Sequence, residues 1–145
     1  MKNLRYGLVG ISFVLAVFSC SKNNREISAP VSVADLLAAK PWKLVSFGFD
    51  TNKNGMVDPD EESIPDCMKD NTYWFKKDGS GIVYENSNIC NGNAPTTHFK
   101  WMLTQNDTVL DFHTGYAYIQ RITADSLYTA DSKTNPEKLL AVYGR

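Results

Sequence analysis

The chain of 145 residues is poor in the residues on which many functions depend, with only two histidines, three cysteines and a formal net charge of −1. A balanced charge argues against the clustered positive surface of a nucleic-acid-binding protein. Neither His98 nor His113 belongs to a catalytic triad pattern or a zinc-protease motif, and no glycine-rich phosphate loop follows a predicted strand. We therefore expect a single non-catalytic domain without a nucleic-acid partner.

Long hydrophobic runs are also scarce, because the one run at residues 6–18 is too short for a stable membrane-spanning helix. Lys2 and Arg5 precede this run, and Ser19 and Cys20 follow it. A basic start, a short apolar stretch and a small residue at the end form the layout of a secretory signal peptide. We expect residues 1–20 to direct export of the chain.

The end of this segment, Val-Phe-Ser-Cys at residues 17–20, resembles the lipobox of bacterial lipoproteins, in which the cysteine is lipidated and becomes the new N-terminus. This resemblance implies a signal peptide with a lipobox, a lipid anchor on Cys20 and attachment to a membrane of the bacterial cell envelope. By the sorting rules of that class, Ser21 favours the outer membrane. An ordinary cleaved signal followed by a free cysteine is the alternative.

The anchored cysteine precedes a polar segment, residues 21–31, which has no apolar periodicity and is typical of a flexible tether. A folded domain over residues 32–145 follows. Ser32 and Asp35 have the spacing of a helix-capping pair, and Pro41 prevents a helix from continuing, so we expect one short helix at the start of the domain.

Beyond this helix, short apolar runs alternate with turn residues, which is the signature of an all-β domain. Asp78-Gly79 is the clearest hairpin turn, because glycine readily adopts the positive φ that tight turns require. The predicted strands are residues 42–49, 72–75, 81–86, 97–103, 109–112, 117–122, 126–130 and 139–143. These eight runs predict an antiparallel up-and-down meander closed into a barrel, since closure removes exposed strand edges. A β-sandwich is the alternative.

Several features follow one another along the chain: Trp42 at the start of the first predicted strand, the segment from Cys67 through Tyr73 and Phe75 to Asp78-Gly79, and then Cys90 and Trp101. This arrangement resembles that of small bacterial lipocalin-like lipoproteins. The resemblance covers residues 33–145. It implies a barrel that binds a small hydrophobic molecule, although it does not identify the contacting residues. We also expect the protein to be a monomer. The alternative is a non-catalytic structural or protein-interaction lipoprotein whose barrel is filled by its own side chains.

Five aromatic residues bear on this choice, because they could either line a cavity or fill the barrel. They are Trp42, Trp101, Tyr116, Tyr118 and Tyr128.

Cys67 and Cys90 form an even pair once Cys20 carries the anchor. In an oxidising exported compartment such a pair most often forms a disulfide. A metal-binding thiolate pair is the rival, but no histidine or further cysteine lies at ligand spacing.

Residues 50–61 match the calcium-loop pattern D-x-[DN]-x-[DN]-G-x5-E at every defined position, with Gly55 at the sharp turn. The flanking segments do not read as helices, so we expect an EF-hand-type loop that holds one structural calcium ion and does not act as a sensor. The alternative is a solvated acidic turn. The six candidate ligands are Asp50, Asn52, Asn54, the carbonyl of Met56, Asp58 and Glu61.

Overall fold

The computed structural model describes residues 30–145, so the predicted signal peptide, Cys20 and most of the predicted tether lie outside the described residues. The described part contains one α-helix, α1 (Val33–Ala38), one 3-10 turn, η1 (Asp66–Met68), and a nine-stranded antiparallel sheet. None of its helices is long and apolar enough to cross a membrane. The strands are β1 (Trp42–Phe49), β2 (Thr72–Phe75), β3 (Ser80–Tyr84), β4 (Thr96–Lys100), β5 (Met102–Thr104), β6 (Val109–Asp111), β7 (Tyr116–Ile122), β8 (Ser126–Ala130) and β9 (Leu139–Gly144).

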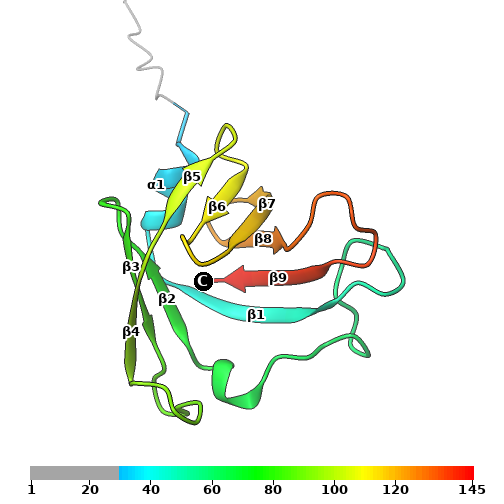
Figure 1. The fold of residues 1–145 in the computed structure, drawn as a ribbon, viewed down its shortest axis with the longest axis horizontal. Helices are drawn as coiled ribbons and strands as arrows, with labels where there is room; N and C mark the ends of the chain where they lie inside the picture. Colours follow the sequence, from blue (N-terminus) through cyan, green and yellow to red (C-terminus); the bar gives the residue numbers. More distant parts are fainter. Residues whose placement is uncertain (1–29) are drawn as a thin grey trace, which may run out of the picture.

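The sheet curls into a nearly closed barrel, with the strand order β4-β3-β2-β1-β9-β8-β7-β6-β5 (Figure 1). Every strand pairs antiparallel with its neighbours, and β1 lies between β2 and β9. The all-β barrel with a short first helix is thus confirmed, and the alternative of two separate sheets in a sandwich is wrong, since one continuous sheet contains all nine strands.

The strand count is nine instead of eight because the predicted strand at residues 97–103 bends at Trp101. Its first part is β4, which pairs with β3, and its second part is β5, which pairs with β6. The Trp101 backbone N–H donates to the Gly79 carbonyl at 2.8 Å, and its indole Nε1 donates to the Ser80 carbonyl at 2.9 Å. These bonds hold the bend against the β2–β3 hairpin, so one bent segment joins the two edges of the sheet.

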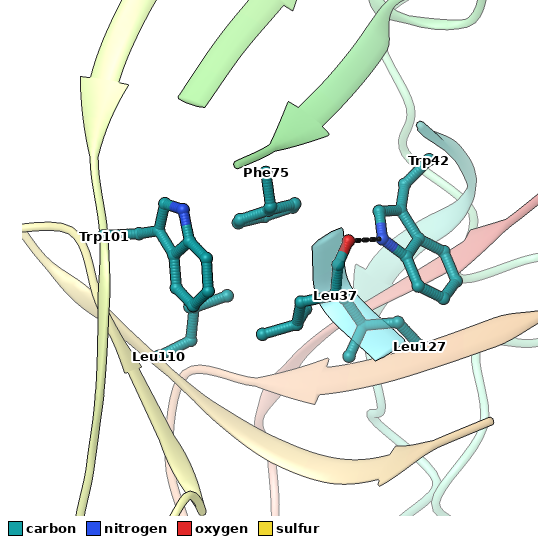
Figure 2. Close-up of a cluster of buried hydrophobic side chains, with 6 residues drawn as sticks. All are labelled: Leu37, Trp42, Phe75, Trp101, Leu110 and Leu127. Carbon is teal, nitrogen blue, oxygen red and sulfur yellow. Dashed lines mark hydrogen bonds between the residues drawn. The ribbon is translucent and has the colours of Figure 1, made fainter. Parts of the chain in front are cut away.

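Ser32 caps the N-terminus of helix α1, because its hydroxyl accepts the backbone N–H of Asp35 at 3.0 Å, as the capping spacing predicts. The helix contributes Leu37 to the core, where this side chain is completely buried. The Leu37 carbonyl accepts the indole N–H of Trp42 at 2.9 Å, and Figure 2 shows this bond. This contact satisfies the buried indole and fixes the helix to the start of β1.

The centre of the barrel is packed with large apolar side chains (Figure 2). Phe75 stacks edge-to-face with Trp101, with ring centroids 5.6 Å apart, and with Phe99 at 5.4 Å. The Phe99 ring lies directly over Gly81, where a Cβ would come within 2.1 Å of the ring. The six fully packed residues are Leu37, Trp42, Phe75, Trp101, Leu110 and Leu127.

Candidate functional site

A hollow of about 240 Å³ remains in the barrel beside this packed centre. Tyr73 lies two residues from the core residue Phe75 on β2 and therefore shares its inward face. Val83 pairs with Tyr73, and Thr97 pairs with Val83, so this row of side chains also faces inward. The residues that line the hollow are Tyr73, Phe75, Val83, Thr97, Phe99, Phe112, Thr114 and Tyr143.

The lining of the hollow is apolar and uncharged, with hydroxyl groups as its polar atoms. The rings of Tyr73 and Tyr143 meet edge-to-face, with centroids 5.5 Å apart. Burial raises the pKa of the Tyr143 phenol far above its ordinary value. Burial also raises the pKa of Tyr73. Both phenols therefore stay neutral. A ligand in the hollow would contact apolar ring surfaces and, at the end of each ring, an uncharged hydroxyl group.

The size of the hollow limits what it can hold. Pockets for drug-sized ligands run from about 300 to 1,000 Å³, whereas an apolar cavity of about 150 Å³ already takes up benzene. At about 240 Å³, the hollow suits an aromatic ring system or a short acyl chain and not a large ligand.

The match to known families accords with this architecture. A family model described as "Lipocalin-like domain" matches residues 39–128, which is well over half of the chain. The chain belongs to the lipocalin-like domain family. The matched range of this lipocalin-like domain includes both barrel cysteines, the long β1–β2 connection and every hollow-lining residue except Tyr143. A search of curated proteins finds no match to the chain.

The aromatic residues singled out from the sequence do not line the hollow. Trp42 and Trp101 belong to the packed centre. Tyr116 is 60% exposed, and the guanidinium of Arg121 covers the ring of Tyr128 at 4.0 Å. The lining aromatics instead come from β2, from β9 and from the neighbourhood of the Trp101 bend, a set that only the strand register brings together.

The predicted calcium loop of the lipocalin-like domain connects β1 to η1 and folds back against the sheet. Gly48 pairs with Glu62 in an isolated bridge, and Ser63 donates its backbone N–H to the Phe47 carbonyl at 2.8 Å. A Cβ on Gly48 would lie 2.0 Å from the Glu61 carbonyl oxygen. Glycine at this position therefore lets the loop lie directly on the strand.

Asp50, at the first position of the loop, is 1% exposed. Its two carboxylate oxygens accept the backbone N–H groups of Asn54 and Gly55, each at 2.9 Å. Gly55 has a φ of +83°, which permits the sharp turn predicted there. A buried carboxylate held only by neutral donors is a group that a bound cation would stabilise further.

The remaining polar side chains of the loop converge on one another. Asp58 Oδ2 accepts the side-chain amides of Asn52 at 2.7 Å and Asn54 at 2.9 Å. Glu61 Oε1 accepts the Thr51 backbone N–H at 2.7 Å, and its Oε2 accepts the Asp58 backbone N–H at 3.1 Å. The Thr51 hydroxyl contributes most to lowering the pKa of Glu61, which falls to about 2, and the loop N–H groups add to it.

These residues fit a calcium ion in donor type, since carboxylate, amide and main-chain oxygens are the ligands that Ca²⁺ prefers. The carboxylates are held by loop N–H groups and do not form a cluster on their own. Within residues 30–145, no three His, Cys, Asp or Glu side chains gather as a metal site. The loop would therefore bind calcium through the amides and the Met56 carbonyl as well as its three carboxylates, after the Asn52 and Asn54 amides turn their oxygens inward.

The Cys67–Cys90 disulfide is confirmed, with Cα atoms 5.0 Å apart, and the rival thiolate metal pair is wrong. The bridge ties η1 to the β3–β4 connection. The buried carboxylate of Glu85 lies beside it and accepts the Cys90 backbone N–H at 3.2 Å and the Asn93 amide at 3.0 Å. The long β1–β2 connection is thus fixed to the sheet at its start and covalently at its end.

Proposed function

We propose that this lipocalin-like domain binds the apolar part of a small amphipathic molecule in the barrel hollow. The observation that carries the proposal is an aromatic-lined space of about 240 Å³ in which no lining side chain is charged. The phenols of Tyr73 and Tyr143 supply hydrogen-bonding groups at its wall. An apolar ring would gain the hydrophobic free energy of burial there while its polar end remained near solvent.

Binding of 2-naphthol, a neutral fluorescent ring compound, tests this function. We expect saturable binding to the purified protein and a loss of at least tenfold in affinity for Val83→Trp, because the larger ring fills the hollow. Val45→Trp is the matched control, since Val45 is 56% exposed on the same sheet and does not line the hollow. Equal binding by both variants, or none by the wild type, would contradict the proposal.

A second candidate is a non-catalytic structural or protein-interaction module with a filled barrel. The observation in its favour is the dense centre formed by Trp42, Phe75 and Trp101, which occupies much of the interior. This candidate predicts that 2-naphthol does not bind the wild-type protein. The same titration therefore distinguishes the two functions.

We also propose that the loop at residues 50–61 holds one calcium ion that stabilises the β1–β2 connection. The support is the full pattern match together with the convergence of Asp50, Asn52, Asn54, Asp58 and Glu61 in one wrap. We expect calcium to raise the melting temperature of the wild type over that in chelator.

The Glu61→Gln variant tests the calcium proposal, because it removes the carboxylate that would close the site. The calcium-induced rise should disappear in this variant. Glu62→Gln makes the same change in charge one residue away, outside the pattern, and should keep the rise. A rise retained in Glu61→Gln would refute calcium binding by this loop.

Finally, we propose that the protein is a monomeric, non-enzymatic lipoprotein anchored through Cys20 in the bacterial cell envelope, with Ser21 directing it to the outer membrane. The support is the lipobox-like sequence at residues 17–20. Cys20→Ala should leave the membrane fraction, and Ser21→Asp should remain in the inner membrane. Unchanged fractionation of Cys20→Ala would contradict the anchor.

A further inference from the structure

A second concavity, of about 380 Å³, lies on the outer side of the barrel, between the loop and strands β7 to β9. Tyr128 pairs with both Arg121 and Val142, which places these side chains on one face of the sheet. The next register pair, Leu127 with Tyr143, faces the interior, because Leu127 belongs to the packed centre. The thickness of the sheet therefore separates this outer groove from the hollow.

The floor of the outer groove is apolar, and its rim is basic. Leu140 and Val142 of β9 and Met56 of the loop supply the apolar surface, and the Met56 side chain is 59% exposed. Arg121 and Lys138 supply two positive charges. Exposed apolar surface beside unneutralised charge is the composition expected of a site for an amphipathic molecule.

The two cations of the outer groove have no acidic partner within residues 30–145, where the ion pairs join Lys53 to Glu137, Lys69 to Asp66 and Lys77 to Asp35. The Arg121 guanidinium is instead positioned by its stacking on Tyr128, with Cζ 4.0 Å from the ring centroid. A stacked guanidinium keeps its planar donors available for an oxyanion, which carboxylates and phosphates match geometrically.

We propose that the outer groove is a second ligand site, for a small amphiphile with a carboxylate or phosphate head. The head group binds Arg121 and Lys138, and the apolar body lies on Leu140, Val142 and Met56. The volume of about 380 Å³ lies within the range of small-molecule pockets. This site is independent of the proposed ligand of the barrel hollow, because different faces of the sheet form the two.

Calorimetric titration of the purified protein with octanoate, octyl phosphate and 1-octanol, below their aggregation concentrations, tests this site. The three compounds share one apolar chain and differ in the head group, so they separate charge recognition from burial. We expect at least one of the two anions to bind at least tenfold more tightly than octanol, and the tighter one identifies a free acid or a phosphate head as the natural class. Equal affinity of all three compounds, or no binding of either anion, would overturn the proposal.

Variants locate the site. Arg121→Gln/Lys138→Gln should lose at least tenfold in affinity for the anion, whereas Lys100→Gln, on the distant strand β4, should not. Val83→Trp, which fills the hollow, should leave anion binding unchanged, so this site and the barrel function can fail separately. Loss of binding in Val83→Trp, or full binding in the double variant, would place the anion elsewhere and refute the outer groove.

A measurement on the wild type alone covers the case in which the double variant does not fold. The affinity for the anion should fall as sodium chloride rises, because salt screens the charges of Arg121 and Lys138. The affinity for octanol should not fall in this way. An anion affinity independent of salt would overturn the assignment of these two cations.

Discussion

The guanidinium of Arg145 lies over the indole of Trp42, with its Cζ atom 3.8 Å from the ring centroid. The same guanidinium donates to the carbonyls of Ala124 and Leu36, so one side chain links β9 to the β7–β8 turn and to helix α1. These contacts cover the outer side of an indole that is itself completely buried.

Arg145→Ala should therefore lower the free energy of unfolding by about 1–2 kcal/mol, since both the cation–π contact and the carbonyl bonds are lost. Urea denaturation measures this change. Arg121→Ala, which removes a comparable stacking contact from a strand surface, should cost less than 1 kcal/mol. Equal losses of unfolding free energy in the two variants would show that the contact of Arg145 with Trp42 stabilises the fold no more than a stacking contact on the strand surface does.

Gly48 is the position where the loop lies closest to the barrel, and Gly48→Ala should push the loop away from β1. A Cβ there would lie 2.0 Å from the Glu61 carbonyl oxygen and 2.8 Å from Val57 Cγ1. We expect a loss of about 1–3 kcal/mol in the free energy of unfolding, because main-chain atoms must move apart. Gly115→Ala is the control, since no atom lies within 4 Å of its Cβ position, and it should leave stability nearly unchanged.

The low pKa of Glu61, about 2, predicts that acid weakens the loop. The folded-state pKa lies below the ordinary value of 4.5, so the stabilisation is complete above pH 4.5 and is lost as the pH falls toward 2. In chelator, the wild type should lose more stability over this range than Glu61→Gln does. Carboxyl carbon NMR titration measures the pKa directly, and a value near 4.5 would contradict the hydrogen-bonded loop.

The Cys67–Cys90 bridge closes a loop with a sequence separation of 23 residues. On the chain-entropy view, such a bridge stabilises the folded state by about 3 kcal/mol. Cys67→Ala/Cys90→Ala should lower the free energy of unfolding by about this amount, and a reductant should destabilise the wild type but not the double variant. Insensitivity of the wild type to reductant would mean that the bridge adds little.

The sequence was sufficient for the barrel because local signals agree along the chain. Asp78-Gly79 marks a hairpin, Ser32 and Pro41 delimit the helix, and the apolar runs carry the strands. The bend at Trp101 escaped prediction, since the alternating positions of Phe99, Trp101 and Leu103 continue across it and do not show that the two halves pair with different strands. Its cause is a set of long-range bonds to Gly79 and Ser80.

The lining of the hollow was also beyond reach of the sequence. Tyr73 and Tyr143 meet only because β1 pairs with both β2 and β9. Tyr116 and Tyr128 are candidates for the lining because they are aromatic. This property does not show on which face of the sheet a residue lies. The predicted calcium pattern, by contrast, is entirely local, so its candidate residues could be named from spacing alone, and the structure adds Gly48 and Thr51 as residues that hold the loop in its conformation.

The pairing of β1 with β9 has a consequence for how the chain acquires its fold. β9 is the ninth strand in chain order, and it pairs with β1 along nearly its whole length, from Lys43 with Gly144 to Phe49 with Leu139. Because the chain is synthesised from its N-terminus, one edge of β1 remains unpaired until β9 has been made. Such non-local pairing is intrinsically slow. Barrel closure therefore waits for β9, and until then the free edge of β1 can pair with strands of other chains.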